Sequence, residues 1–125
     1  MKTFASYGSL KKGYWNHDRY GLGEPIATSE VYGEMYVNPS LGYPHLYETS
    51  DEKPLANPKF YEVELYDIED AIFNRIDMME QASGYYPKEI TFILESGAKQ
   101  NAVVWFADSK WIPKPEHYVE EYAKI

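Results

Sequence analysis

The sequence predicts a single α+β domain over residues 1–125, in which several strands surround one principal helix. A chain of 125 residues can bury one core and is too short for two ordinary domains. Apolar residues make up 44% of the chain, which excludes intrinsic disorder. One helical segment among several alternating segments is not the pattern of a doubly wound parallel sheet.

Six segments in which polar and apolar residues alternate predict the strands. They cover residues 2–7, 24–37 (as one long strand or two), 43–48, 59–66, 86–95 and 102–107. Polar, Gly-containing or Pro-containing stretches separate them, including the turn 96–101 between the last two.

The principal helix is predicted over residues 67–81. Four apolar residues recur there at helical spacing and define a face to bury: Ile68, Ile72, Ile76 and Met79. Asp67 is an acceptable N-cap, and Ser83-Gly84 ends the helix. Short peripheral helices are expected near residues 16–18 and over residues 117–124.

The charge of the chain argues against several classes of partner. Its formal net charge is −8 and its sequence pI is about 4.8, which disfavours binding to nucleic acid or to anionic lipid. The only basic cluster, Lys11-Lys12, is too small for a nucleic-acid patch. No apolar run approaches the roughly 20 residues of a membrane span, and the N-terminus does not resemble a secretion signal. We therefore expect a cytoplasmic protein that binds neither nucleic acid nor membranes.

Metal or cofactor chemistry has no support in the sequence. Cysteine is absent, which removes thiolate metal ligands, disulfides and a Cys nucleophile. The histidines at positions 17, 45 and 117 lack metal-ligand spacing. No phosphate loop, dinucleotide fingerprint or Gly-x-Ser-x-Gly elbow occurs. We expect a site without a metal or a cofactor.

The segment Tyr7-Gly8-Ser9-Leu10 lies where the first strand ends. A Gly followed by Ser allows a sharp turn whose successive N–H groups can converge on a carboxylate or an oxyanion. The alternative is an ordinary turn that merely ends the strand, and four residues alone do not decide between the two.

Glu80 is the most informative polar residue. Ile76 and Ile72 lie four and eight residues before it, so its side chain leaves the helix along the apolar face. Burial and the negative end of the helix dipole would both raise the pKa of its carboxyl toward neutrality. A carboxyl with such a pKa suits proton transfer. The alternative is that Glu80 lies in water at a frayed helix end.

Several anchors in one order resemble the gamma-glutamylcyclotransferase-like superfamily, which includes the gamma-glutamylamine cyclotransferases and AIG2-like proteins. The anchors are Tyr7-Gly8-Ser9-Leu10-Lys11-Lys12-Gly13 with Asn16-His17, Tyr32-Gly33-Glu34-Met35-Tyr36, Val63-Glu64-Leu65-Tyr66, Ile76-Asp77-Met78-Met79-Glu80, and Tyr85-Tyr86. They extend over nearly the whole chain. The resemblance implies a compact mixed β-barrel or strongly bent sheet with helices packed outside.

The resemblance also implies an activity and a site. The family's catalytic glutamate corresponds to Glu80, and its substrate-binding loop corresponds to Tyr7, Gly8, Ser9 and Leu10, with Tyr86 beside them. The implied enzyme is of the acyltransferase or lyase type: the α-amine of a small-molecule γ-glutamyl substrate attacks its own γ-carbonyl, releasing 5-oxoproline and an amine. Glu80 would be the general acid/base.

Two positions depart from the family pattern. Pro87 stands where relatives commonly have Arg, and Gln81 stands where they often have Gly. The alternative function is therefore a non-catalytic or regulatory relative that binds a small carboxylate-bearing ligand or a protein partner.

Overall fold

The computed structural model describes residues 1–37, 44–48, 58–107 and 118–119. Its elements are β1 (Lys2–Ser6), α1 (Trp15–Tyr20), β2 (Ala27–Val37), β3 (Pro44–Tyr47), β4 (Lys59–Ile68), α2 (Asp70–Ala82), β5 (Tyr85–Ile93), β6 (Lys99–Ala107) and β7 (Tyr118–Val119). The α+β class and the single principal helix, α2, are confirmed.

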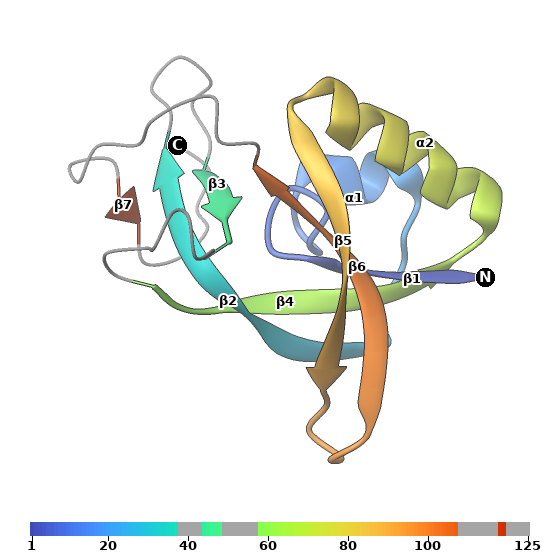
Figure 1. Ribbon diagram of the computed structural model, residues 1–125. Coiled ribbons are helices and arrows are strands. Elements are labelled where there is room, and N and C mark those ends of the chain that lie inside the picture. The colour runs from blue at the N-terminus through green and yellow to red at the C-terminus, as the bar shows by residue number, and fades with distance from the viewer. Residues whose placement is uncertain (38–43, 49–57, 108–117, 120–125) are drawn as a thin grey trace.

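The strands form one strongly bent sheet in the order β3-β2-β4-β1-β6-β5, with β7 paired to β2 (Figure 1). All pairs are antiparallel except β1 with β6. The sheet curls until β5 approaches β2, and the Ser29 hydroxyl donates to the Ile93 carbonyl at 3.0 Å across that approach. The result is a half-barrel.

Alternation along the strands divides the core between the two faces of the sheet. Ala5, Val63 and Leu65 belong to a cluster inside the curl. Their neighbours Phe4 and Tyr66 belong to a second cluster, which includes residues of both helices. In Figure 1, α1 and α2 lie on the same side of the bent sheet.

The expected start of the principal helix is wrong by three residues. Asp67 and Ile68 are the last residues of β4, and Glu69 is the N-cap of α2. Pairing with β1 extends the strand, because Lys2 pairs with Ile68 and the Thr3 hydroxyl donates to the Asp67 carboxylate. Tertiary pairing overrides the local helical pattern.

Other boundaries also differ from expectation. β2 begins at Ala27 instead of residue 24, and β5 covers Tyr85–Ile93 instead of residues 86–95. β6 begins at Lys99, which pairs with Ile93, so the turn between β5 and β6 is shorter than residues 96–101. Residues 118–119, expected in a C-terminal helix, form β7 against β2. The rest of the expected helix over 117–124 lies outside the described residues.

Candidate active site

The predicted substrate turn follows β1 directly. The Lys11 amide donates to the Gly8 carbonyl at 2.9 Å and closes the turn, while the Gly8 amide donates to Ser6 Oγ at 3.3 Å. Gly8 is not among the glycines with positive φ, so the turn does not need a left-handed residue there. Among the described residues, the amides of Ser9 and Leu10 have no hydrogen-bond acceptor. Two successive donors are therefore available to an anion.

Glu80 lies in the last turn of α2 and is partly buried. Burial, and after it the charge of Asp77 one turn earlier, raise the pKa of its carboxyl from 4.5 to about 7. The structure thus agrees with the increase in the pKa of Glu80 that the apolar spacing predicts. Burial is the cause that the sequence predicts, and the charge of Asp77 adds to it. At a pKa near 7 the carboxyl can both accept and donate a proton near neutral pH.

One residue of β6 joins the turn to the last part of α2. The buried indole of Trp105 donates from Nε1 to Asp77 Oδ1 at 2.8 Å. The Trp105 carbonyl accepts a hydrogen bond from the Tyr7 hydroxyl at 2.7 Å. Tyr7 and the helix turn that carries Asp77 and Glu80 are therefore bound to the same residue.

Tyr86 and Tyr85 point to opposite faces of β5, as successive strand residues do. The Tyr86 ring packs with Phe106 at 6.1 Å between centroids, inside the curl, and its hydroxyl donates to Glu48. The other oxygen of Glu48 accepts from Lys88 Nζ at 2.6 Å. The contacts of Tyr86 thus lie with Glu48 and the interior of the sheet.

Tyr85 packs against the cluster that includes α2. Its ring stacks on His45 at 5.3 Å, and its hydroxyl lies 2.6 Å from His45 Nδ1. Burial lowers the pKa of His45 to about 4, so this imidazole is neutral near pH 7. Sequence reasoning selected Tyr86 and did not single out the pair Tyr85–His45, because the register of β5 decides which tyrosine faces the helix.

The two departures from the family pattern have structural consequences here. Gln81 Nε2 donates to Asp77 Oδ2 at 2.9 Å, one helical turn apart on the exposed side. Pro87 lies in β5, the edge strand of the sheet, where a missing N–H is tolerated.

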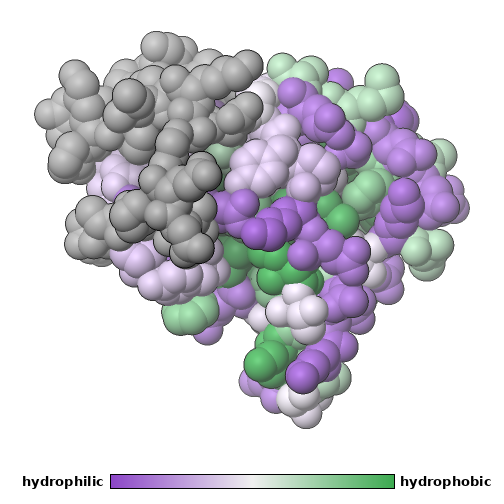
Figure 2. Space-filling model, viewed as in Figure 1, coloured by the Kyte–Doolittle hydropathy of each residue, from purple (hydrophilic) through white to green (hydrophobic). Residues whose placement is uncertain are grey.

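A cleft of about 960 Å³ lies between β2, β4 and the end of β5. Tyr7 is the predicted site residue that lines it, and Glu80 is not part of its described lining. Its charged lining residues are Lys11, Glu30, Lys59, Glu62 and Glu95. Figure 2 shows apolar surface exposed between hydrophilic side chains around the β5–β6 hairpin that borders this cleft.

Two classes of feature are absent from the part of the chain that the structure describes. No group of three or more His, Asp or Glu residues there could hold a metal ion. Neither described helix is long and apolar enough to cross a membrane.

The sequence and the fold of the chain match known proteins. A family model described as "Gamma-glutamyl cyclotransferase, AIG2-like" matches residues 4–123. A protein of Methanocaldococcus jannaschii that carries the provisional name gamma-glutamylcyclotransferase MJ1514 is 33% identical over 114 residues, which are 85% of this chain and 84% of that protein. The chain therefore belongs to the gamma-glutamyl cyclotransferase, AIG2-like family. It is a cyclotransferase-like enzyme.

Two crystal structures share the fold. Uncharacterized protein PH0828 of Pyrococcus horikoshii superposes with a TM-score of 0.63 at 22% identity, covering 99% of this chain and 86% of that one. An AIG2-like protein of Mus musculus gives a TM-score of 0.65 at 18% identity, covering 98% and 88%. At these identities the likeness shows the fold alone, and it confirms the bent sheet with helices outside.

Proposed function

We propose that the protein is a cofactor-independent cyclotransferase that cleaves a γ-glutamyl amine or amide into 5-oxoproline and a free amine. The α-amine of the γ-glutamyl group attacks its own γ-carbonyl, and the bond from that carbonyl to the leaving nitrogen breaks. No water is consumed. Because nucleophile and electrophile belong to one molecule, holding them in the attacking geometry supplies much of the acceleration.

Glu80 carries the protons in this proposal. Its carboxylate takes a proton from the α-ammonium, which frees the nitrogen lone pair for attack. Glu80 then gives this proton to the leaving nitrogen as the tetrahedral intermediate collapses. The restored carboxylate takes the second proton that the ring nitrogen loses on becoming an amide, and that proton passes to the released amine. A carboxyl with a pKa near 4.5 would be a weak base for an ammonium, so a pKa of about 7 favours this role.

The turn Tyr7–Leu10 supplies the fixed donors. The amides of Ser9 and Leu10, which have no acceptor in the part of the chain that the structure describes, can bind the substrate carboxylate or the oxyanion that develops on the γ-carbonyl. Tyr7 connects this turn through Trp105 to Asp77, one turn from Glu80. We place Tyr86 with these substrate-binding residues because its ring belongs to the same interior cluster as Tyr7.

The strongest support for this function is the raised pKa of the Glu80 carboxyl. Glu80 is a partly buried acid with a pKa raised to about 7. The resemblance in sequence assigns this position to the family's catalytic glutamate. No described residue forms an ion pair with Glu80. Burial of such an acid disfavours folding, and a cost of this kind is common at functional sites.

A screen of the purified protein against γ-glutamyl amines and γ-glutamyl peptides, with 5-oxoproline and free amine both measured, tests the proposal. We expect equal amounts of the two products. Glu80→Gln keeps the shape of the side chain but cannot accept a proton, so kcat should fall by about 10²–10⁴-fold. Glu89→Gln, at an exposed glutamate of β5, is the matched control and should keep parental activity. Turnover by Glu80→Gln at the parental rate, or no turnover of any γ-glutamyl compound, would contradict the proposal and favour a binding protein.

A further inference from the structure

The short helix α1 holds the substrate turn with two successive side chains. Asn16 and His17 are both buried. Asn16 Nδ2 donates to Ser9 Oγ at 2.8 Å, and His17 Nδ1 lies 3.2 Å from the Leu10 carbonyl oxygen. Two neighbouring residues of the helix thus contact two neighbouring residues of the turn.

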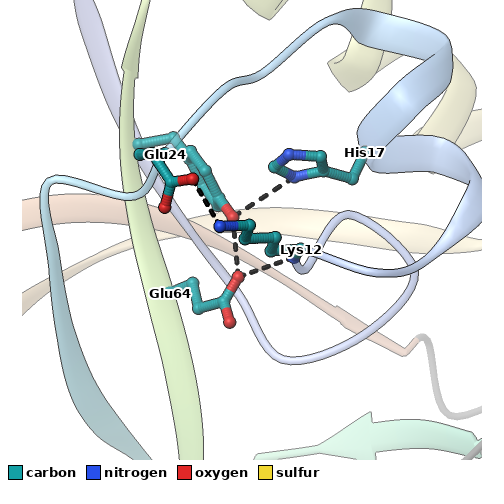
Figure 3. Close-up of polar contacts among 5 residues, drawn as sticks. Lys12, His17, Glu24 and Glu64 are labelled. Atoms are coloured by element: carbon teal, nitrogen blue, oxygen red, sulfur yellow. Dashed lines mark hydrogen bonds and ion pairs between the residues drawn. The ribbon is translucent and has the colours of Figure 1, made fainter.

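The hydrogen-bond partners of His17 determine where its proton lies (Figure 3). His17 Nδ1 is 3.3 Å from the Tyr66 hydroxyl, which donates its own hydrogen to Glu64 Oε1 at 2.6 Å. The Leu10 carbonyl can only accept, and the Tyr66 oxygen has already used its hydrogen. His17 Nδ1 must therefore carry a hydrogen and donate to both oxygens.

Glu64 closes the network on the other side of the turn. Its Oε1 also accepts from the Lys12 amide at 2.7 Å, and the Lys12 ammonium pairs with Glu24 (Figure 3). Strand β4 therefore holds the Lys12 amide directly and the Leu10 carbonyl through Tyr66 and His17.

Tyr66 gives this network a rigid base. Its side chain is 1% exposed, and its ring stacks on Phe4 of β1 at 5.4 Å and meets the His17 ring edge-on at 5.5 Å. A ring fixed between two elements holds its hydroxyl in one place.

The peptide unit between Leu10 and Lys11 is bound at both ends. His17 holds the Leu10 carbonyl, and the Gly8 carbonyl accepts from the Lys11 amide at 2.9 Å. The peptide units just before it carry the Ser9 and Leu10 amides, which have no acceptor among the described residues. A fixed Leu10–Lys11 unit limits the directions in which those two amides can point.

We propose that His17 is a positioning residue for the substrate turn, and that Tyr66 and Glu64 hold it in the donating state. The inference rests on the proposed role of the turn in binding a γ-glutamyl group. His17 does not itself contact the substrate. It orients the Ser9 and Leu10 amides, which do.

Paired substitutions test the role of the single donor at Nδ1. His17→Leu and His17→Asn have the same branched shape, but Asn places an N–H close to the position of Nδ1. We expect His17→Leu to lower kcat/KM by ten-fold or more, and His17→Asn to recover most of that loss, since a misplaced donor costs up to about 100-fold. A parental kcat/KM in His17→Leu, or equal losses in the two variants, would overturn the inference.

Tyr66→Phe tests the same network with little change in packing, because the stacked ring remains. It should lower kcat/KM, as His17→Leu does. The pH dependence of kcat/KM that comes from titration of the Glu80 carboxyl should stay unchanged. Tyr20→Phe, at a buried tyrosine of α1 outside the network, is the control and should match the parent.

Amide hydrogen exchange provides a readout that needs no turnover. Loss of the network should speed exchange at the Lys11 and Lys12 amides by ten-fold or more in His17→Leu and Tyr66→Phe, with the Ile76 amide in α2 unchanged. If no γ-glutamyl compound reacts but these amides lose protection, the proposed function fails and the positioning of the turn stands. If substrate reacts and protection is the same in all variants, the positioning inference is wrong.

Discussion

The carboxyl of Glu80 lies in the last turn of α2, where burial and the charge of Asp77 both disfavour its ionised form. Structural roles for glutamate usually place it in water or beside a cation. Proton transfer requires neither water nor a cation beside the glutamate. It benefits from a carboxyl that gains and loses its proton near neutral pH. The same environment has a consequence for stability that can be measured without a substrate.

Glu80→Gln should stabilise the protein at neutral and alkaline pH. The pKa of Glu80 is about 7 in the folded state against an ordinary value of 4.5, so the folded protein binds the proton more tightly. Ionisation then costs folding free energy as pH rises from about 4.5 to about 7, and the full cost persists above that range. The neutral amide avoids it, by up to about 3 kcal/mol.

Urea denaturation of the parent and Glu80→Gln at several pH values measures this effect. The variant should gain stability relative to the parent from pH 5 to pH 8, with the difference vanishing near pH 4.5. A stability difference that is constant with pH would mean that the carboxyl is not held in a disfavoured charged state.

For individual residues, the sequence predicts the raised pKa of Glu80 but not the contact between Asp77 and Trp105. The spacing of Ile72, Ile76 and Glu80 is local, so the direction of the pKa change could be predicted before the structure. Asp77 also lies on the helix, three residues earlier, and this spacing could have identified it. Trp105 could not be found in this way, because its bond to Asp77 joins residues 28 positions apart.

At the scale of elements, strands β2 and β3 pack closely at Gly33. A Cβ at Gly33 would lie 2.6 Å from the Tyr47 carbonyl oxygen and 3.0 Å from Leu46 Cδ1. The first of these atoms is backbone, so β3 as a whole would have to move. The approach places β3, with His45, beside the strand that carries Glu34 and Tyr36.

Gly33→Ala should therefore destabilise the protein by about 1–3 kcal/mol through overpacking between β2 and β3. Hydrogen exchange should show lost protection in the ladder between Met35 and Leu46. Gly84→Ala is a useful comparison, since Gly84 has φ of 92° but no atom near its added Cβ. It should cost about 1 kcal/mol through backbone strain and leave the β2–β3 ladder intact. Equal loss of that ladder in both variants would contradict the steric account.

Element types were predictable from the sequence more readily than their ends. Alternation identified β4, but its last two residues were assigned to α2 because Ile68 also fits the helical spacing. Only pairing with β1 shows that the strand continues, and pairing is a non-local property. Residues 118–119 are a second example, because they form a strand only by pairing with β2.

Across the whole molecule, the strand order brings the turn after β1 and helix α2 into contact with one residue, Trp105. β1 lies between β4 and β6, so the turn after β1 lies next to β6 and to Trp105, which contacts α2. No local pattern in the sequence predicts this order. The bent sheet could be anticipated only from the order of motifs along the chain, through their resemblance to a family.

We propose that the turn Tyr7–Leu10 and Glu80 act on one and the same γ-glutamyl group. A crystal structure of the protein with 5-oxoproline bound tests it most directly. We predict that the product lies within hydrogen-bond distance of both a backbone N–H of the turn and the Glu80 carboxyl. Binding of 5-oxoproline in the cleft lined by Lys11 and Lys59, without contact to Glu80, would contradict the account.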